Sequence, residues 1–206
     1  MVTITGPGGI GKTQTAVQVA KRLAESDKLA ICAVGLAPIE DPSLVIATIA
    51  LALALPENPE QKIIDTLAAF IRDKALLLVL DNCEHVMDEA ANVATALLAE
   101  CPVLRILATS REPLNMSEEC IFRLPPLSTP GKNIDALTKR EASEYEAIAL
   151  FCDRASALDH RFGLTDENAP VVADLCIRLD GIPQSIELAA ARATALSLQV
   201  GHRASR

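Results

Sequence analysis

The chain has 206 residues, of which 50% are hydrophobic and 22% charged, so its composition is that of a globular protein and excludes a disordered or fibrous one. Its 19 basic and 27 acidic side chains give a net charge of −8, which repels a phosphate backbone, and only 2% of the residues are aromatic, too few for the stacking surfaces of single-strand and RNA readers. Direct binding of nucleic acid by this segment is therefore not expected.

Neither a membrane segment nor a disulfide framework is expected. The longest apolar run, residues 44–55, is too short for a bilayer span, which takes about 20 residues. The first residues carry neither the basic region nor the cleavage site of a secretory signal. The six cysteines form no CxxC pair and are expected to be reduced core residues. The expected compartment is the cytoplasm, without a membrane partner.

Strand-sized apolar runs alternate with helical patterns along the first 124 residues. The unbroken aliphatic run at 75–80 is typical of a strand buried on both faces of a parallel sheet. The expected strands are 2–5, 29–36, 75–80, 104–109 and 120–124. The expected helices between them are 13–24, one that starts at 44 and ends by 56, one that includes 63 to 71, and 87–100. The pattern predicts an α/β fold with a five-stranded parallel sheet flanked by helices.

The character of the sequence changes after residue 125, because Pro125, Pro126, Pro130 and Gly131 mark a turn-rich link with no strand signal beyond it. Helical periodicity returns at 144–158 and at 166–179, which Gly181 is expected to end as the C′ residue, and a last helix follows Ile182-Pro183. We expect one domain at 1–127, a linker at 128–143, a small all-helical subdomain at 144–197 and a tail at 198–206.

Residues 6–13 read GPGGIGKT, which matches the phosphate-binding pattern GxxxxGK[ST] between a predicted strand and a predicted helix. Glycines let backbone N–H groups turn toward phosphates, and the helix N-terminus adds a partial positive charge. Lys12 is expected to reach the terminal phosphates and Thr13 to hold Mg²⁺. The residues expected to contact a nucleotide here are Gly6, Gly8, Gly9, Ile10, Gly11, Lys12, Thr13 and Gln14.

A P-loop site also needs an acid at the carboxyl end of an apolar strand, where it reaches Mg²⁺ through water, and Asp81 stands at that place. Asn82 follows, where many hydrolysing P-loop enzymes carry the carboxylate that orients water. An amide cannot accept the proton. The catalytic base therefore lies elsewhere, with Glu84 as the nearest candidate, or hydrolysis is slow.

Arg111 follows the fourth predicted strand and is expected at the same sheet edge as the glycine-rich loop, where a guanidinium can sense a γ-phosphate. The alternative is a surface arginine paired with Glu112. The candidate catalytic residues are Lys12, Asp81, Glu84 and Arg111, and the candidate metal ligands are Thr13 and Asp81.

The ordered motifs GPGGIGKT, LLLVLDNCEH, LRILATSREPL and DGIPQSIELAAAR resemble those of STAND signal-transduction ATPases, which include the NB-ARC modules, and in particular those of bacterial LuxR-type, SARP-type and adenylate-cyclase-linked regulators. The resemblance covers residues 2–197. It implies that the strands before Asp81 and Arg111 lie beside the strand of the glycine-rich loop, with a helical lid after the sheet. It also implies that Gly181 and Pro183 contact the adenine base and that Arg111 is the phosphate sensor.

The chain departs from this family at two positions and in its extent, and the departure at Gly35, where the regulators usually carry an acid, has no derivable consequence. Gln184 stands where the family usually has Leu after the proline, which puts nucleotide affinity and the base contact in doubt. The winged-helix, sensor and output domains of a full regulator are not in these residues, so such domains are expected partners. Nucleotide-dependent self-association is left open.

Three functions are compatible with these sequence features. The first is a slow ATP/ADP-dependent switch of a transcriptional or signalling regulator, with Mg²⁺ as cofactor, in which the γ-phosphate biases the orientation of sheet and lid. The second, a small nucleotide or metabolite kinase, usually needs several arginines on a mobile lid, whereas those after residue 144 are scattered along helices. The third is a nucleotide-binding interaction module without turnover. Adenine is the expected base, because the guanine-reading NKxD motif does not occur.

Overall fold

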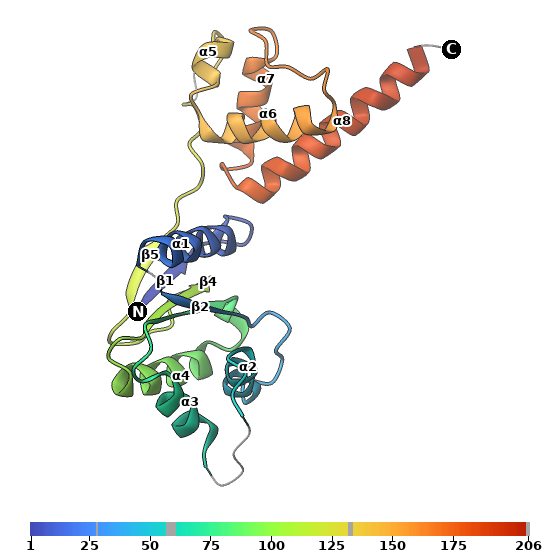
Figure 1. The fold of residues 1–206 in the computed structure, drawn as a ribbon. Coiled ribbons are helices and arrows are strands. Elements are labelled where there is room, and N and C mark those ends of the chain that lie inside the picture. Colours follow the sequence, from blue (N-terminus) through green and yellow to red (C-terminus); the bar gives the residue numbers. More distant parts are fainter. Residues whose placement is uncertain (28, 57–60, 132–133, 205–206) are drawn as a thin grey trace. The chain divides into compact units, whose positions relative to one another are not determined.

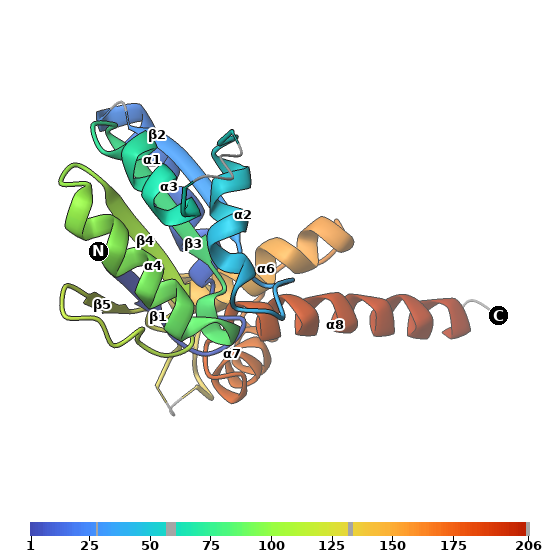
Figure 2. The same ribbon diagram turned by 90° about the horizontal axis from the view of Figure 1, so that it is seen from below.

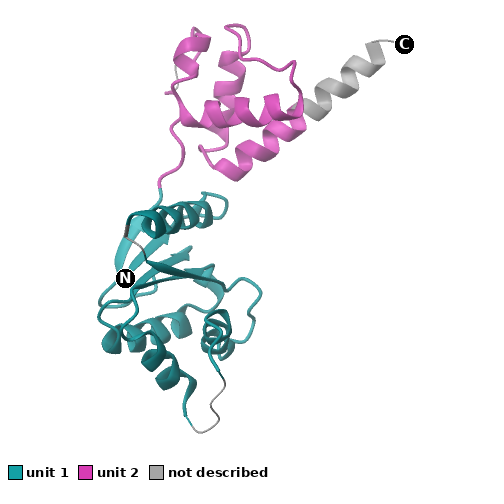
Figure 3. Ribbon diagram, in the orientation of Figure 1, with its two compact units in different colours: residues 1–124 teal, residues 125–206 magenta. Residues whose placement is uncertain are grey.

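The computed structural model describes residues 1–27, 29–56, 61–131 and 134–204 (Figures 1 and 2). The chain divides into two compact units, residues 1–124 and residues 125–206 (Figure 3). Each unit is described by itself.

Unit 1 contains a five-stranded, all-parallel sheet with the strand order β2-β3-β4-β1-β5. Its strands are β1 (Val2–Thr5), β2 (Ala30–Gly35), β3 (Leu76–Asp81), β4 (Arg105–Ser110) and β5 (Cys120–Arg123). Every residue of β3 before Asp81 is buried, as its unbroken aliphatic run predicts. The α/β fold with five parallel strands is thus confirmed.

The strand order corrects one implication of the family resemblance. β4 pairs with β1, but β3 pairs with β2 and β4, so β4 separates the strand of Asp81 from the strand of the glycine-rich loop. The resemblance implies that both strands lie beside β1. In the structure, the carboxyl end of β4 lies between those of β1 and β3.

Helices cover both faces of the sheet in unit 1 (Figure 1). Helix α1 (Lys12–Asp27) packs on one face, and α2 (Leu44–Ala52), α3 (Ile63–Ile71) and α4 (Met87–Glu100) pack on the other. A short 3₁₀ turn, η1 (Cys83–His85), joins β3 to α4.

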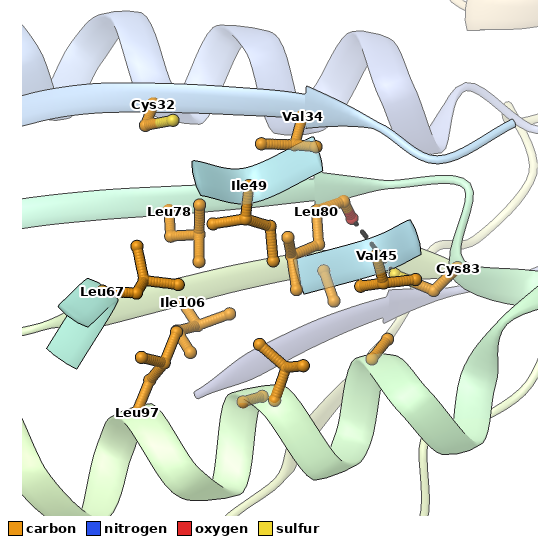
Figure 4. Packing of buried hydrophobic residues seen from close by; sticks show 14 of the residues in the cluster. Cys32, Val34, Val45, Ile49, Leu67, Leu78, Leu80, Cys83, Leu97 and Ile106 are labelled. Atoms are coloured by element: carbon orange, nitrogen blue, oxygen red, sulfur yellow. Dashed lines mark hydrogen bonds between the residues drawn. The ribbon is translucent and has the colours of Figure 1, made fainter. Parts of the chain in front are cut away.

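Alternating strand residues build a separate apolar cluster on each face, as the period of two of a strand requires. On one face, Leu77 and Leu107 pack with Ala16 of α1. On the other face, side chains of β2, β3 and β4 pack with those of α2, α3 and α4; the cluster includes Val34, Val45, Ile49, Leu67, Leu78, Leu80, Leu97 and Ile106 (Figure 4). This two-sided packing fixes the carboxyl ends of β1, β3 and β4 relative to one another.

Unit 2 is helical, with α5 (Lys139–Ala142), α6 (Glu146–Leu158), α7 (Ala169–Arg178) and α8 (Pro183–Ala204). The predicted helical subdomain after the sheet is confirmed. Its core joins α6, α7 and α8 through residues that include Ile148, Phe151, Val172, Cys176 and Ile186.

Two segments of unit 2 differ from the sequence prediction. Helix α5 lies within the predicted linker and begins with a capping box, in which the Thr138 hydroxyl accepts from the Glu141 N–H and the Glu141 carboxylate accepts from the Thr138 N–H. The sequence signal for this helix is the Thr-x-x-Glu pattern of Thr138 and Glu141. Helix α8 continues to Ala204, through most of the stretch after Ser197 that was predicted to be a tail.

Candidate functional site

The loop between β1 and α1 has the backbone that a phosphate cradle requires. Gly6, Gly9 and Gly11 have φ angles of 152°, 76° and 101°, which side-chain-bearing residues rarely adopt. A Cβ added at Gly8 or Gly11 would meet no atom within 4 Å, so the loop has room there for a ligand. The side chain of Ile10, another residue of this loop, is buried.

Lys12 is the first residue of α1, and its side chain is enclosed by the loop that precedes it. The residue is 7% exposed, and its Nζ donates hydrogen bonds to the carbonyl oxygens of Gly6 at 2.8 Å and Pro7 at 3.1 Å. Burial lowers the pKa of Lys12, and the nearby Glu84 carboxylate opposes this shift. A buried ammonium whose hydrogen-bond acceptors are neutral carbonyls provides the positive charge that a phosphate needs.

Thr13 and Asp81 meet at the carboxyl edge of the sheet. The Thr13 hydroxyl donates to Asp81 Oδ1 at 2.8 Å, and the Thr109 hydroxyl donates to the same oxygen at 2.6 Å. Hydroxyl and carboxylate oxygens are hard ligands of the kind that Mg²⁺ takes together with phosphate oxygens. In the described part of the chain, no three His, Cys, Asp or Glu side chains gather as a metal cluster. The donor set therefore fits a Mg²⁺ ion that a nucleotide brings, rather than one in an all-protein cage.

Asn82 turns the chain away from the sheet directly after Asp81. Its φ and ψ angles of 65° and 52° are left-handed, a conformation that asparagine tolerates better than most residues. Its backbone N–H donates to the Thr109 hydroxyl at 2.9 Å. The sharp turn leads into η1 and so places Glu84 near the sheet edge.

Glu84 forms an ion pair with Arg111. The distance between Glu84 Oε1 and Arg111 Nε is 3.2 Å, and the Glu84 side chain is 11% exposed whereas that of Arg111 is 62% exposed. The second oxygen of Glu84, Oε2, is buried and has no hydrogen-bond partner among the described residues. Arg111 thus pairs with Glu84, and the alternative pairing with Glu112 is not among the ion pairs of the described residues.

The sheet gathers the four predicted catalytic residues at one edge. Glu84, Arg111 and Asp81 all act electrostatically on Lys12, and Asp81 bonds directly to Thr13. Gln14 lies exposed on α1. The residue that sequence reasoning missed is Thr109, which is buried and joins Asp81 to Asn82.

Gly181 and Asp180 in unit 2 end helix α7 as a Schellman motif. The Asp180 N–H donates to the Ile177 carbonyl at 2.9 Å, and the Gly181 N–H donates to the Cys176 carbonyl at 3.2 Å. Both residues have positive φ angles, 52° at Asp180 and 64° at Gly181. The C′ residue is therefore Asp180, one position before the predicted Gly181.

Gly181 and Pro183 each have a structural role in unit 2. A Cβ at Gly181 would overlap the Leu127 carbonyl oxygen, and the Leu127 N–H donates to the Gly181 carbonyl at 3.0 Å. Pro183 is the first residue of α8, a position that suits its fixed φ and its missing N–H. The adenine contact of these two residues stays a prediction.

No helix among the described residues is long and apolar enough to cross a bilayer.

The sequence is similar to segments of longer proteins. "Putative HTH-type transcriptional regulator Rv0890c" of Mycobacterium tuberculosis is 43% identical over 197 residues, which are 96% of this chain and 20% of that protein. "Uncharacterized protein Rv0894" of the same organism is 40% identical over 96% of this chain and 47% of its own length. The chain thus spans about a fifth and about half of these two relatives.

A solved structure shares the fold of this chain, and a family model matches its sequence. The structure of Cdc6p from Pyrobaculum aerophilum superposes with a TM-score of 0.62 at 16% identity, over 97% of this chain and 56% of that one, and it shares the P-loop NTPase fold. The AAA domain family matches residues 1–116, more than half of the chain. With its parallel sheet and its glycine-rich phosphate loop, the chain belongs to the AAA domain family of P-loop ATPases.

Proposed function

We propose that this chain is the ATP- and ADP-binding switch module of a larger regulator and that it hydrolyses ATP slowly. The observation that carries the proposal is the buried ammonium of Lys12, enclosed by two carbonyls of the glycine-rich loop and flanked by the Thr13–Asp81 pair. Phosphate oxygens are the ligands that fit such a buried, carbonyl-held cation beside a helix N-terminus.

Mg²⁺ fits the neighbouring Thr13 hydroxyl and Asp81 carboxylate and, when bound, neutralises charge on the phosphates. The protein's own groups do the remaining work. The loop N–H groups orient the phosphates, Lys12 stabilises the terminal ones, and the two-sided packing of the sheet holds Asp81 in place beneath them.

We assign Glu84 as the base and Arg111 as the phosphate sensor. In the ion-paired state, Arg111 holds one oxygen of Glu84, and the other oxygen is buried without a partner among the described residues. A bound γ-phosphate competes with the Glu84 carboxylate for the Arg111 guanidinium, because both groups are anions. Hydrolysis is slow because the residue after Asp81 is an amide and because Glu84 must first leave its ion pair.

Two observations support the switch role: the relatives are much longer than the matched segment, and the chain consists of two units. One relative is named as an HTH-type transcriptional regulator, and most of its length lies outside the matched segment. We propose that unit 2 acts as the lid, with Gly181 and Pro183 at the adenine base, and that nucleotide state is passed to regulatory or output domains of the longer protein or to a second copy of this chain.

Competition and single-turnover kinetics test the proposal together. ATP should displace a fluorescent ADP analogue at a lower concentration than GTP does. With protein in excess over ATP, phosphate release should be far slower than the 1–100 per second typical of kinases. Displacement by GTP at the same concentration as ATP would contradict the adenine assignment. Turnover at kinase-like rates with an added small-molecule acceptor would contradict the switch.

A further inference from the structure

Thr109, the residue before the last one of β4, is the centre of the hydrogen bonds at the sheet edge. It is 0% exposed. Its hydroxyl accepts from the Asn82 N–H at 2.9 Å and is 2.6 Å from Asp81 Oδ1. Because a backbone N–H can only donate, the hydroxyl must use a lone pair toward Asn82, and its single proton is left for the carboxylate. The direction of both bonds is therefore fixed.

The same carboxylate oxygen receives a second hydroxyl proton from Thr13, at 2.8 Å. The two donors differ in what else they do. Thr13 is exposed and is itself the proposed metal ligand, so its oxygen has a second use. Thr109 is buried and also bonded to the backbone at Asn82, which fixes its hydroxyl beside Asp81.

We propose that Thr109 is a positioning residue that orients the Asp81 carboxylate for Mg²⁺, acting through Asp81 and without contact to the nucleotide. The inference rests on the proposed function, because it assumes that Asp81 serves a nucleotide-bound metal. Hydrogen-bond partners of metal ligands typically contribute 10–100-fold to metal affinity, since they fix the ligand in its productive rotamer. The strand order makes the arrangement feasible, as β4 lies between the strands of Asp81 and of the loop.

Three substitutions isolate the hydroxyl. Thr109→Val removes it with little change in volume, and Thr109→Ser retains it. Thr3→Val is the matched control, because Thr3 is an equally buried threonine on the neighbouring strand β1 whose hydroxyl has no hydrogen-bond partner among the described residues. If Thr109→Val does not fold by circular dichroism, Thr109→Cys replaces it, since a thiol is of similar size but only a weak donor.

The measurement is ADP binding by calorimetry, first in EDTA and then across a Mg²⁺ titration. The quantity compared is the Mg²⁺ concentration that gives half of the Mg²⁺-dependent gain in ADP affinity. We expect this concentration to be about 10–100-fold higher for Thr109→Val than for the wild type, with unchanged ADP affinity in EDTA. Thr109→Cys should shift in the same direction by about tenfold. Thr109→Ser and Thr3→Val should behave as the wild type.

The outcomes distinguish failure of the positioning role of Thr109 from failure of the proposed nucleotide-binding function. A Mg²⁺ requirement of Thr109→Val, or of Thr109→Cys where it is used, equal to that of the wild type overturns the role of Thr109 and leaves the proposed function standing. So does failure of Thr109→Ser to retain the wild-type requirement, or a loss of ADP affinity in EDTA that matches the loss in Mg²⁺. Wild-type protein that binds no ADP in either condition overturns the proposed function itself and, with it, the inference.

Discussion

Thr13 Oγ1 and Asp81 Oδ1 are 2.8 Å apart, although 68 positions separate the two residues in the sequence. The bond joins the first turn of α1 to the last residue of β3. Both oxygens are also the proposed partners of Mg²⁺. The Thr13 hydroxyl gives Asp81 only its proton, so its oxygen lone pairs remain available to a metal ion.

Thr13→Ala should weaken ADP binding in the presence of Mg²⁺ by about tenfold and leave binding in EDTA unchanged, because only the metal-dependent part of the affinity uses the hydroxyl. Calorimetry under the two conditions measures both values. Thr48→Ala is the control, since the Thr48 hydroxyl bonds to a backbone carbonyl of α2, at 2.8 Å, far from the loop in sequence. An equal loss in EDTA would show that Thr13 supports the loop and not the metal.

Glu84→Gln should lower the single-turnover hydrolysis rate, by up to about 10²–10⁴-fold if Glu84 provides the base, while ADP affinity stays the same. Asn82→Asp should then make little difference to the rate. Rapid-quench measurement of phosphate release tests both variants. If Glu84→Gln hydrolyses ATP as fast as the wild type and Asn82→Asp is faster, the protein has no base at Glu84.

Arg111→Gln should reduce affinity for ATP more than affinity for ADP, because a sensor of the γ-phosphate contributes only when that phosphate is present. We expect a loss of about tenfold in the ATP-to-ADP affinity ratio, measured by competition with a fluorescent nucleotide. Arg72→Gln breaks a well-exposed ion pair with Glu100 and serves as the control for loss of a surface charge. Equal losses for ATP and ADP would argue against a sensor.

Gly181→Ala should destabilise unit 2 by at least about 1–2 kcal/mol, since φ at this position is 64° and the new Cβ would overlap the Leu127 carbonyl oxygen. Urea unfolding followed by circular dichroism gives the free energy. Gly163→Ala is the matched control, because its Cβ would meet no atom within 4 Å. Similar stability of the two variants would mean that the turn at Gly181 rearranges without cost.

Local signals in the sequence predicted much of unit 1. The GPGGIGKT motif, the aliphatic run before Asp81 and the strand before Arg111 each depend on residues close together in the chain, so pattern and spacing were enough to find them. Parallel strands also align their carboxyl ends, so the sequence predicts Asp81 and Arg111 at the same sheet edge as the glycine-rich loop.

Strand order was not predictable in this way, because pairing joins segments far apart in the chain and leaves no local pattern. Thr109 was therefore missed as a partner of Asp81, since only the position of β4 beside β3 brings the two residues together. The sequence predicts Gly181 as the C′ residue of α7, but the left-handed Asp180 takes that position. Gly181 follows it because Leu127, 54 positions earlier in the chain, approaches too closely for a side chain.

The most direct test of nucleotide binding at the loop is thermal unfolding with and without Mg-ADP, in the wild type, Lys12→Ala and Lys21→Ala. At millimolar nucleotide and a micromolar dissociation constant, binding adds about 4 kcal/mol of stability, and a chain of this size gains about 2–4 °C per kcal/mol. The melting temperature of the wild type and of Lys21→Ala, which changes an exposed lysine on the same helix, should rise by several degrees. Lys12→Ala should lose most of that rise. An equal rise in all three proteins would contradict nucleotide binding at this site.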